Sequence, residues 1–186
     1  MSVGSLLRSS YLLYFAQPAA ERALYRAARG RPIRSIVELG IGLSGRTPRL
    51  IEVASWRTQN LPLRYTGIDL FEARTSGQPG LSLKQAFAAV KRPQVQVQLV
   101  PGDPAAALRR VANSLTGTDL LVIAADQDRE SLAHAWIWMP RMLTPTSLVF
   151  LEEPASKPGQ RGWRLLKFSD IQRLAAEAGK TVRRAA

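Results

Sequence analysis

A short apolar run that ends in closely spaced glycines places the tightest limit on how this chain folds. The run covers residues 34–39, and the sequence from its end reads Glu38-Leu-Gly40-Ile-Gly42-Leu-Ser-Gly45. An apolar run that meets glycines predicts a buried strand followed by a sharp turn, and Thr47–Ser55 has the composition of a helix. Glycines in such a turn let the backbone approach a nucleotide, because no Cβ stands in the way. The segment therefore predicts a strand, a nucleotide-binding loop and a helix.

Strand and helix patterns alternate along the rest of the chain. Further apolar runs predict strands at Leu63–Asp69, Val95–Val100, Leu120–Ala125 and Ser147–Leu151. Apolar residues at helical spacing predict helices at 18–30, 83–90, 108–115, 132–139 and 171–178, the last ending before Gly179. This alternation predicts an α/β fold, a doubly wound and mostly parallel sheet of about five to six strands with helices on both faces. Ligands of such sheets bind beyond the carboxyl ends of the strands, where the strand order reverses.

Length and composition favour a single domain. The chain has 186 residues, of which 46% are apolar, and this is enough for one sizeable core. We expect one domain over 1–186, with a helical segment at 1–33, a nucleotide-binding core at 34–153 and an abbreviated part at 154–186. The chain has no cysteine, which excludes disulfides and thiolate metal sites. With no long apolar segment either, the sequence predicts a cytoplasmic protein without a membrane partner.

The charge of the chain is strongly positive. Lys and Arg number 26 against 14 Asp and Glu, a formal net charge of +12. Such a field attracts anionic partners, nucleic acid among them. No nucleic-acid-binding motif accompanies it, and a solubilising bias of composition is the alternative interpretation. An anionic acceptor and nucleic acid both stay open.

Two kinds of cofactor suit the glycine loop, and the acid before it separates them. A dinucleotide places its pyrophosphate at the helix N-terminus. Glu38 instead stands two positions before the first glycine, as in the class I S-adenosylmethionine (SAM) methyltransferases, which the chain resembles over roughly residues 34–153. Asp69, in Gly67-Ile-Asp69, resembles the acid that binds both ribose hydroxyls, and Asp103 resembles the one beside the adenine amino group.

The resemblance implies SAM as the cofactor, held by Glu38, Gly40, Gly42, Gly45, Asp69, Leu70 and Asp103. Each acid also has a purely structural interpretation. Glu38 can brace the loop, Asp69 can be a turn residue at a strand end, and Asp103 can cap the next helix.

The acceptor side resembles small-molecule O-methyltransferases of the sugar and antibiotic-tailoring kind. The similarity lies in Asp126, in Trp138-Met-Pro140 and in the pair Glu152-Glu153. Those enzymes often carry a histidine shortly after the strand-four Asp, where this chain has Gln127 and Asp128. The catalytic group is therefore unassigned, with Asp126 and His134 as candidates. No metal is predicted, and the candidate ligands are Asp126, Glu152 and Glu153.

The end of the chain departs from the family, whose sheet finishes with a sixth strand and an antiparallel seventh beside strand five. Residues 179–186 leave room for one short strand, so we expect strand five to have an uncovered edge. A homodimer through that edge, or cover by Pro154–Leu166, would protect it. The expected function is a SAM-dependent methyltransferase of unidentified acceptor. The alternatives are a methyltransferase-like binding or scaffold protein without turnover and an NAD(P)-binding Rossmann protein.

Overall fold

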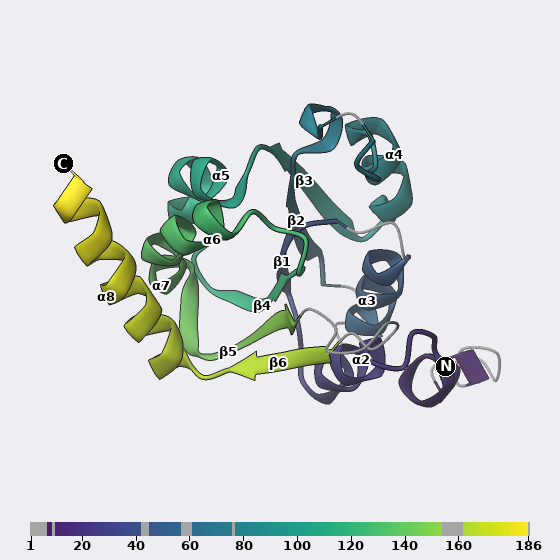
Figure 1. Ribbon diagram of the computed structural model, residues 1–186. Coiled ribbons are helices and arrows are strands. Elements are labelled where there is room, and N and C mark those ends of the chain that lie inside the picture. The colour runs from purple at the N-terminus through teal and green to yellow at the C-terminus, as the bar shows by residue number, and fades with distance from the viewer. Residues whose placement is uncertain are drawn as a thin grey trace.

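In the computed structural model, six strands form one sheet in the order β3-β2-β1-β4-β5-β6 (Figure 1). The structure describes residues 7–8, 10–41, 45–56, 61–75, 77–153 and 162–185, with side chains as far as residue 181. The strands are β1 (Ser35–Leu39), β2 (Leu63–Asp69), β3 (Val95–Pro101), β4 (Thr118–Ile123), β5 (Leu143–Glu153) and β6 (Gly162–Leu166). The first five are parallel, and β6 runs antiparallel to β5. The order reverses between β1 and β4, and in sheets of this kind ligands bind at the carboxyl ends of the strands on either side of that reversal.

Helices cover both faces of this sheet (Figure 1). On one face, α2 (Glu21–Gly30), α3 (Arg46–Ser55) and α4 (Leu83–Val90) pack with the π-helical turn η1 (Tyr11–Phe15). On the other lie α5 (Pro104–Val111), α6 (Arg129–Ala135), α7 (Met139–Met142) and α8 (Phe168–Ala185). Three 3₁₀ turns complete the described elements: η2 (Phe71–Ala73), η3 (Ala112–Ser114) and η4 (Trp136–Trp138).

The central strands β1 and β4 are mostly apolar because both of their faces are buried. In β1, Ile36 packs into the core under α2 and α3, whereas Val37 and Leu39 pack into the core under α5 and α8. Successive side chains of a strand point to opposite faces, so such a strand has no solvent side to mark with polar residues. The predicted α/β class and doubly wound sheet are confirmed.

Some predicted boundaries are wrong. The helix expected to begin at residue 18 begins at Glu21, and the last helix continues through Gly179 to Ala185. A glycine ends a helix when it takes a positive φ, and Gly179 is not among the described glycines that have one. The helix expected at 132–139 is divided into α6, η4 and α7, and Pro140 lies at the start of α7.

The expectation of an uncovered edge on strand five is also wrong. Strand β6 pairs with β5 from Val149↔Leu166 to Glu153↔Gly162. Of the two ways of protecting the edge, cover by part of the segment Pro154–Leu166 is thus the one observed. A homodimer contact through β5 would have to displace β6. No helix in the described part of the chain is both long enough and apolar enough to span a membrane.

Candidate functional site

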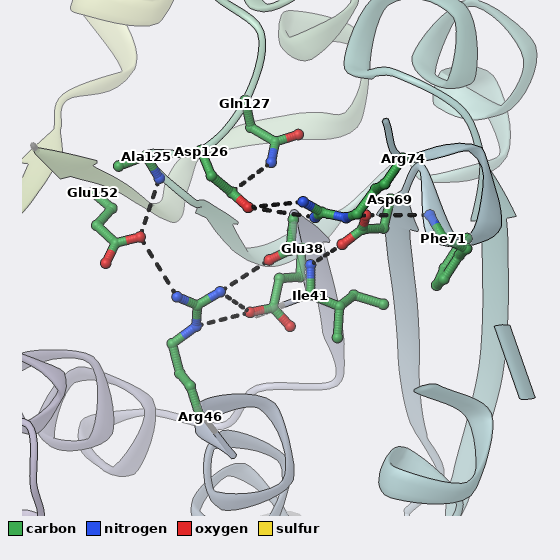
Figure 2. Close-up of polar contacts among 11 residues, drawn as sticks. Glu38, Ile41, Arg46, Asp69, Phe71, Arg74, Ala125, Asp126, Gln127 and Glu152 are labelled. Carbon is green, nitrogen blue, oxygen red and sulfur yellow. Dashed lines mark hydrogen bonds and ion pairs between the residues drawn. The ribbon is translucent and has the colours of Figure 1, made fainter. Parts of the chain in front are cut away.

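The carboxyl ends of β1, β2 and β4 meet at the point where the strand order reverses (Figure 2). Gly40, the first residue after β1, has φ +85°, a conformation that L side chains rarely adopt. A Cβ on Gly40 would lie 2.3 Å from Gln127 Nε2 and 2.8 Å from Ala124 Cβ. The glycine is therefore required both by its backbone conformation and by the loop after β4, which closes directly on it.

Glu38 lies beneath this loop and is completely buried. Its Oε1 accepts hydrogen bonds from Arg46 Nε (2.9 Å) and Nη2 (2.6 Å), and its Oε2 accepts from the hydroxyls of Thr47 (2.6 Å) and Tyr65 (2.9 Å). Burial and the nearby Glu38 carboxylate hold the pKa of the Tyr65 phenol well above its usual value, so Tyr65 remains a donor. In this structure Glu38 braces the loop, and a direct contact between Glu38 and a cofactor stays a prediction.

Arg46 is the partner that sequence reasoning missed. Its side chain is 3% exposed, donates to the Gly40 carbonyl (3.0 Å), lies 3.7 Å from Glu152 and stacks 5.1 Å from the centre of the Trp163 ring. Burial lowers the pKa of Arg46, but the charge and hydrogen bonds of Glu38, with the charges of Glu152 and Glu21, together outweigh this and raise it overall. A basic first residue is unfavourable at a helix N-terminus, and Arg46 begins α3. This unfavourable position could have indicated from the sequence that Arg46 has a specific acidic partner.

Asp69 ends β2 and is 5% exposed. Its Oδ2 accepts from the Ile41 N–H (2.8 Å) in the loop after β1. Its Oδ1 accepts from Arg74 Nε (3.0 Å) and Nη2 (2.8 Å) and from the Phe71 N–H (3.4 Å). The carboxylate thus links the segments that follow β1 and β2. Figure 2 shows Arg74 between Asp69 and Asp126.

The turn after Asp69 is strained at Phe71, which has φ +49° although it is not glycine. Its side chain is buried against Ile41 and Ala86, and this packing holds the unusual conformation in place. Leu70, predicted beside the cofactor, is partly exposed and immediately precedes this turn. Gly45 precedes α3 with φ +69°. Gly42, the remaining predicted glycine, lies outside the described residues.

Asp103 caps α5, as its structural interpretation expected. Its Oδ1 accepts from the Ala106 N–H (3.0 Å) and from the Ser131 hydroxyl of α6. Partial burial raises the pKa of the Asp103 carboxyl, but the bonds from Ser131 and from backbone N–H groups outweigh this and hold that pKa below its usual value. Asp103 therefore joins the exit of β3 to α6. Its predicted contact with adenine stays a prediction.

Replacing Ser131 with alanine should destabilise the protein more at neutral pH than in acid, where the loss of the bond from the Ala105 N–H to the Ser131 hydroxyl (3.0 Å) remains. A hydrogen bond to a charged group contributes about 1.5–3 kcal/mol, and the partial exposure of Asp103 places this bond at the lower end of that range. Because the Asp103 pKa is lowered in the folded state, this stabilisation is present above the unfolded pKa of about 3.9 and is lost as the pH falls through the folded value. Urea unfolding of Ser131→Ala between pH 3 and 7 measures it.

Ser114→Ala is the matched control, because the Ser114 hydroxyl donates to the neutral Val111 carbonyl (2.8 Å). Its effect on the free energy of unfolding should not vary with pH. A Ser131→Ala effect equally independent of pH would show that the Asp103 charge takes no part in the bond.

The structure does not bring the candidate metal ligands together. Glu152 is buried and accepts from the Ala125 N–H (3.0 Å), whereas its neighbour Glu153 is exposed and pairs with Arg164 (3.0 Å). Adjacent residues of a strand point to opposite faces, so only one of the pair lies near Asp126. Among the described residues there is no group of three or more acidic, histidine or cysteine side chains that could hold a metal ion.

The two catalytic candidates differ in their contacts. Asp126 is half-exposed, accepts from Gln127 Nε2 (2.9 Å) and lies 3.3 Å from Arg74 Nη2. His134 lies in the last turn of α6 and is partly buried. None of the hydrogen bonds described between residues of the site involves it. Asp126 is therefore the candidate that adjoins Asp69, through Arg74.

No protein-family model matches this sequence, and no curated protein matches it. Solved structures do share its fold. An O-methyltransferase from Bacillus cereus, in complex with S-adenosylhomocysteine (SAH), is 14% identical, with a TM-score of 0.54, over 94% of this chain and 78% of the other. A TehB-like SAM-dependent methyltransferase from Corynebacterium glutamicum is 18% identical, with a TM-score of 0.52, over 94% of this chain and 80% of the other.

The MycE methyltransferase of the mycinamycin biosynthetic pathway is a more distant match. It is 17% identical, with a TM-score of 0.46, over 83% of this chain, and this chain covers only 36% of its length. Identities this low establish a common fold and no more. The chain therefore has the class I methyltransferase fold that its sequence predicted.

Proposed function

We propose that the chain binds SAM beyond the carboxyl ends of β1 and β2 and transfers its methyl group to an anionic acceptor. The observation that carries the proposal is the place of Asp69. This buried carboxylate ends β2 and holds the Ile41 N–H of the loop after β1, beside the point where the strand order reverses. A carboxylate there can accept two hydrogen bonds from the vicinal hydroxyls of a ribose. Two solved structures with this fold are named as methyltransferases, which supports it.

The residues at the site fit such a cofactor. Gly40 keeps the backbone free of a Cβ where the loops of β1 and β4 meet, and Asp69 with Leu70 would hold the nucleoside. SAM supplies an activated methyl group when bound, and its transfer needs mainly an acceptor held in line. Asp126, half-exposed after β4, is the group placed to accept a proton from an acceptor that must lose one. The net charge of +12 favours an anionic acceptor.

The first test is whether the protein binds SAH rather than a dinucleotide. A ligand at about a hundred times its dissociation constant adds about 2.7 kcal/mol to the free energy of unfolding. We expect SAH to raise the melting temperature in a thermal-shift titration and NADH to leave it unchanged. Stabilisation by NADH and not by SAH would reject the methyltransferase proposal. If SAH binds, the transfer of a labelled methyl group from SAM into metabolite, RNA or protein pools would identify the acceptor. It would also exclude the alternative of a binding protein without turnover.

The ribose role of Asp69 has a matched test. Asp69→Asn keeps the size of the side chain but removes its charge, and it should weaken SAH binding at least tenfold, since hydrogen bonds to charged groups contribute about 1.5–3 kcal/mol. Asp119→Asn is the control, because the Asp119 carboxylate accepts from the N–H groups of Arg34 (2.8 Å) and Ser35 (3.0 Å), at the amino end of β1. Equal SAH affinity in the wild type and Asp69→Asn would remove the ribose role.

A further inference from the structure

Arg74 bridges two carboxylates at the carboxyl ends of β2 and β4 (Figure 2). Its guanidinium donates two hydrogen bonds to Asp69 Oδ1 (3.0 and 2.8 Å) and lies 3.3 Å from Asp126 Oδ2. The Arg74 side chain is 12% exposed and that of Asp69 only 4%, whereas that of Asp126 is 50% exposed. The better-shielded and shorter contact is the one with Asp69, the carboxylate proposed to hold the ribose.

The backbone after η2 fixes this position of Arg74. A Cβ built on Gly80 would lie 2.3 Å from Arg74 Cδ and 2.7 Å from Arg74 Nε. The absence of a side chain at Gly80 is therefore what lets the arginine lie against this segment. The segment is tied down in turn by Glu72, whose carboxylate accepts from the Leu83 N–H (2.9 Å) at the start of α4.

We infer that Arg74 is an internal competitor for the ribose-binding carboxylate and thereby determines how tightly this site holds a nucleoside. The inference rests on the proposed function. Asp69 Oδ2 accepts one hydrogen bond, from the Ile41 N–H, whereas Oδ1 already accepts two from Arg74 and one from the Phe71 N–H (3.4 Å). A diol that bonds to both carboxylate oxygens therefore needs the place on Oδ1 that Arg74 fills. A nucleoside with both ribose hydroxyls binds only when the guanidinium leaves Oδ1.

The displaced guanidinium has a second carboxylate within reach. Asp126 follows β4, on the side where the acceptor is proposed to lie, and it already contacts Arg74. Cofactor binding would thus transfer a cation from the ribose site to the acceptor site. An anionic acceptor would therefore bind after the cofactor, because the Arg74 guanidinium is paired with Asp69 until the cofactor displaces it.

The test measures the affinity of Arg74→Gln for SAH by isothermal titration calorimetry. Glutamine keeps a polar side chain with the same first carbons but is shorter and uncharged, so it removes the charge-assisted hydrogen bonds. We expect SAH to bind about tenfold more tightly, since a hydrogen bond to a charged group contributes at least about 1.5 kcal/mol. The 2′-deoxyribose analogue of SAH, which lacks the diol, should gain much less. SAH carries no net charge, so the lost cation does not itself change the attraction.

Two further variants support the test. Gly80→Ala leaves both charged groups in place but pushes the stem of Arg74 away, so it should also tighten SAH binding, even if Arg74→Gln does not fold. Arg164→Gln removes the same charge from an exposed arginine on β6 that pairs with Glu153. It should leave the SAH affinity unchanged.

The outcomes separate the inference from the proposed function. Tighter binding of SAH by Arg74→Gln and Gly80→Ala, with no change in Arg164→Gln, supports the inference. If the wild type binds SAH and Arg74→Gln binds it equally well or more weakly, the inference is overturned. The proposed function then stands, with Arg74 as a structural ion pair. Failure of the wild type, Arg74→Gln and Gly80→Ala alike to bind SAH overturns both.

Discussion

A protein with methionine in place of Arg46 should lose about 3–5 kcal/mol of its free energy of unfolding, the usual cost of removing one partner of a buried ion pair. The reason is the carboxylate left behind. Glu38 is completely buried, and without Arg46 the hydroxyls of Thr47 and Tyr65 are what remains, among the described residues, to satisfy its charge. Urea unfolding measures the loss as a lower midpoint with an unchanged slope.

Arg173→Met is the control, because Arg173 is 69% exposed and its partner Asp170, 3.5 Å away, is 39% exposed. Exposed ion pairs contribute at most about 1 kcal/mol. The double variant Glu38→Gln/Arg46→Met should recover part of the loss of Arg46→Met, since it removes the unpaired charge. A loss for Arg46→Met no larger than that for Arg173→Met would show that Glu38 is not held as a buried charge.

The central part of the fold was predictable because its strands are buried on both faces. Leu63–Asp69 was predicted with the observed bounds, and the parallel order follows from the alternation of strands with helices. Strand β6 was not predicted as a strand. Its residues Gly162–Leu166 are mostly exposed, so they carry no run of buried apolar positions. Pairing with β5 creates this strand, and that pairing is a tertiary contact that no local pattern records.

The same distinction applies to the candidate site. Asp69 and Asp126 could be placed near each other from sequence, because both follow the carboxyl ends of strands in one sheet. Their link could not be predicted. Arg74 lies in a loop rich in glycine, serine and proline, and only the path of that loop past Gly80 brings it between the two acids. Most arginines of a chain with this excess of positive charge are solvated, so composition gave no reason to select this one.

Gly40→Ala should be the most damaging single-methyl change at the site. The φ of +85° at Gly40 costs about 1–3 kcal/mol for a residue with a side chain. The new methyl would also meet Ala124 Cβ at 2.8 Å, and overpacking of this kind typically costs a further ~1–3 kcal/mol. Because Ala124 is fixed by a hydrogen bond from its N–H to the Leu39 carbonyl (2.8 Å), the strain cannot be relieved by turning a side chain.

Gly117→Ala separates these two costs. Gly117 has φ +73°, yet a Cβ there would find no atom within 4 Å. It should lose only the contribution from backbone strain, and the additional loss in Gly40→Ala measures how firmly the loop after β4 presses on the exit of β1. Equal losses in the two variants would mean that this loop yields easily. In that case Asp126 would have no fixed place beside Asp69, and Arg74 could follow Asp126 away from Asp69 without any nucleoside to displace it.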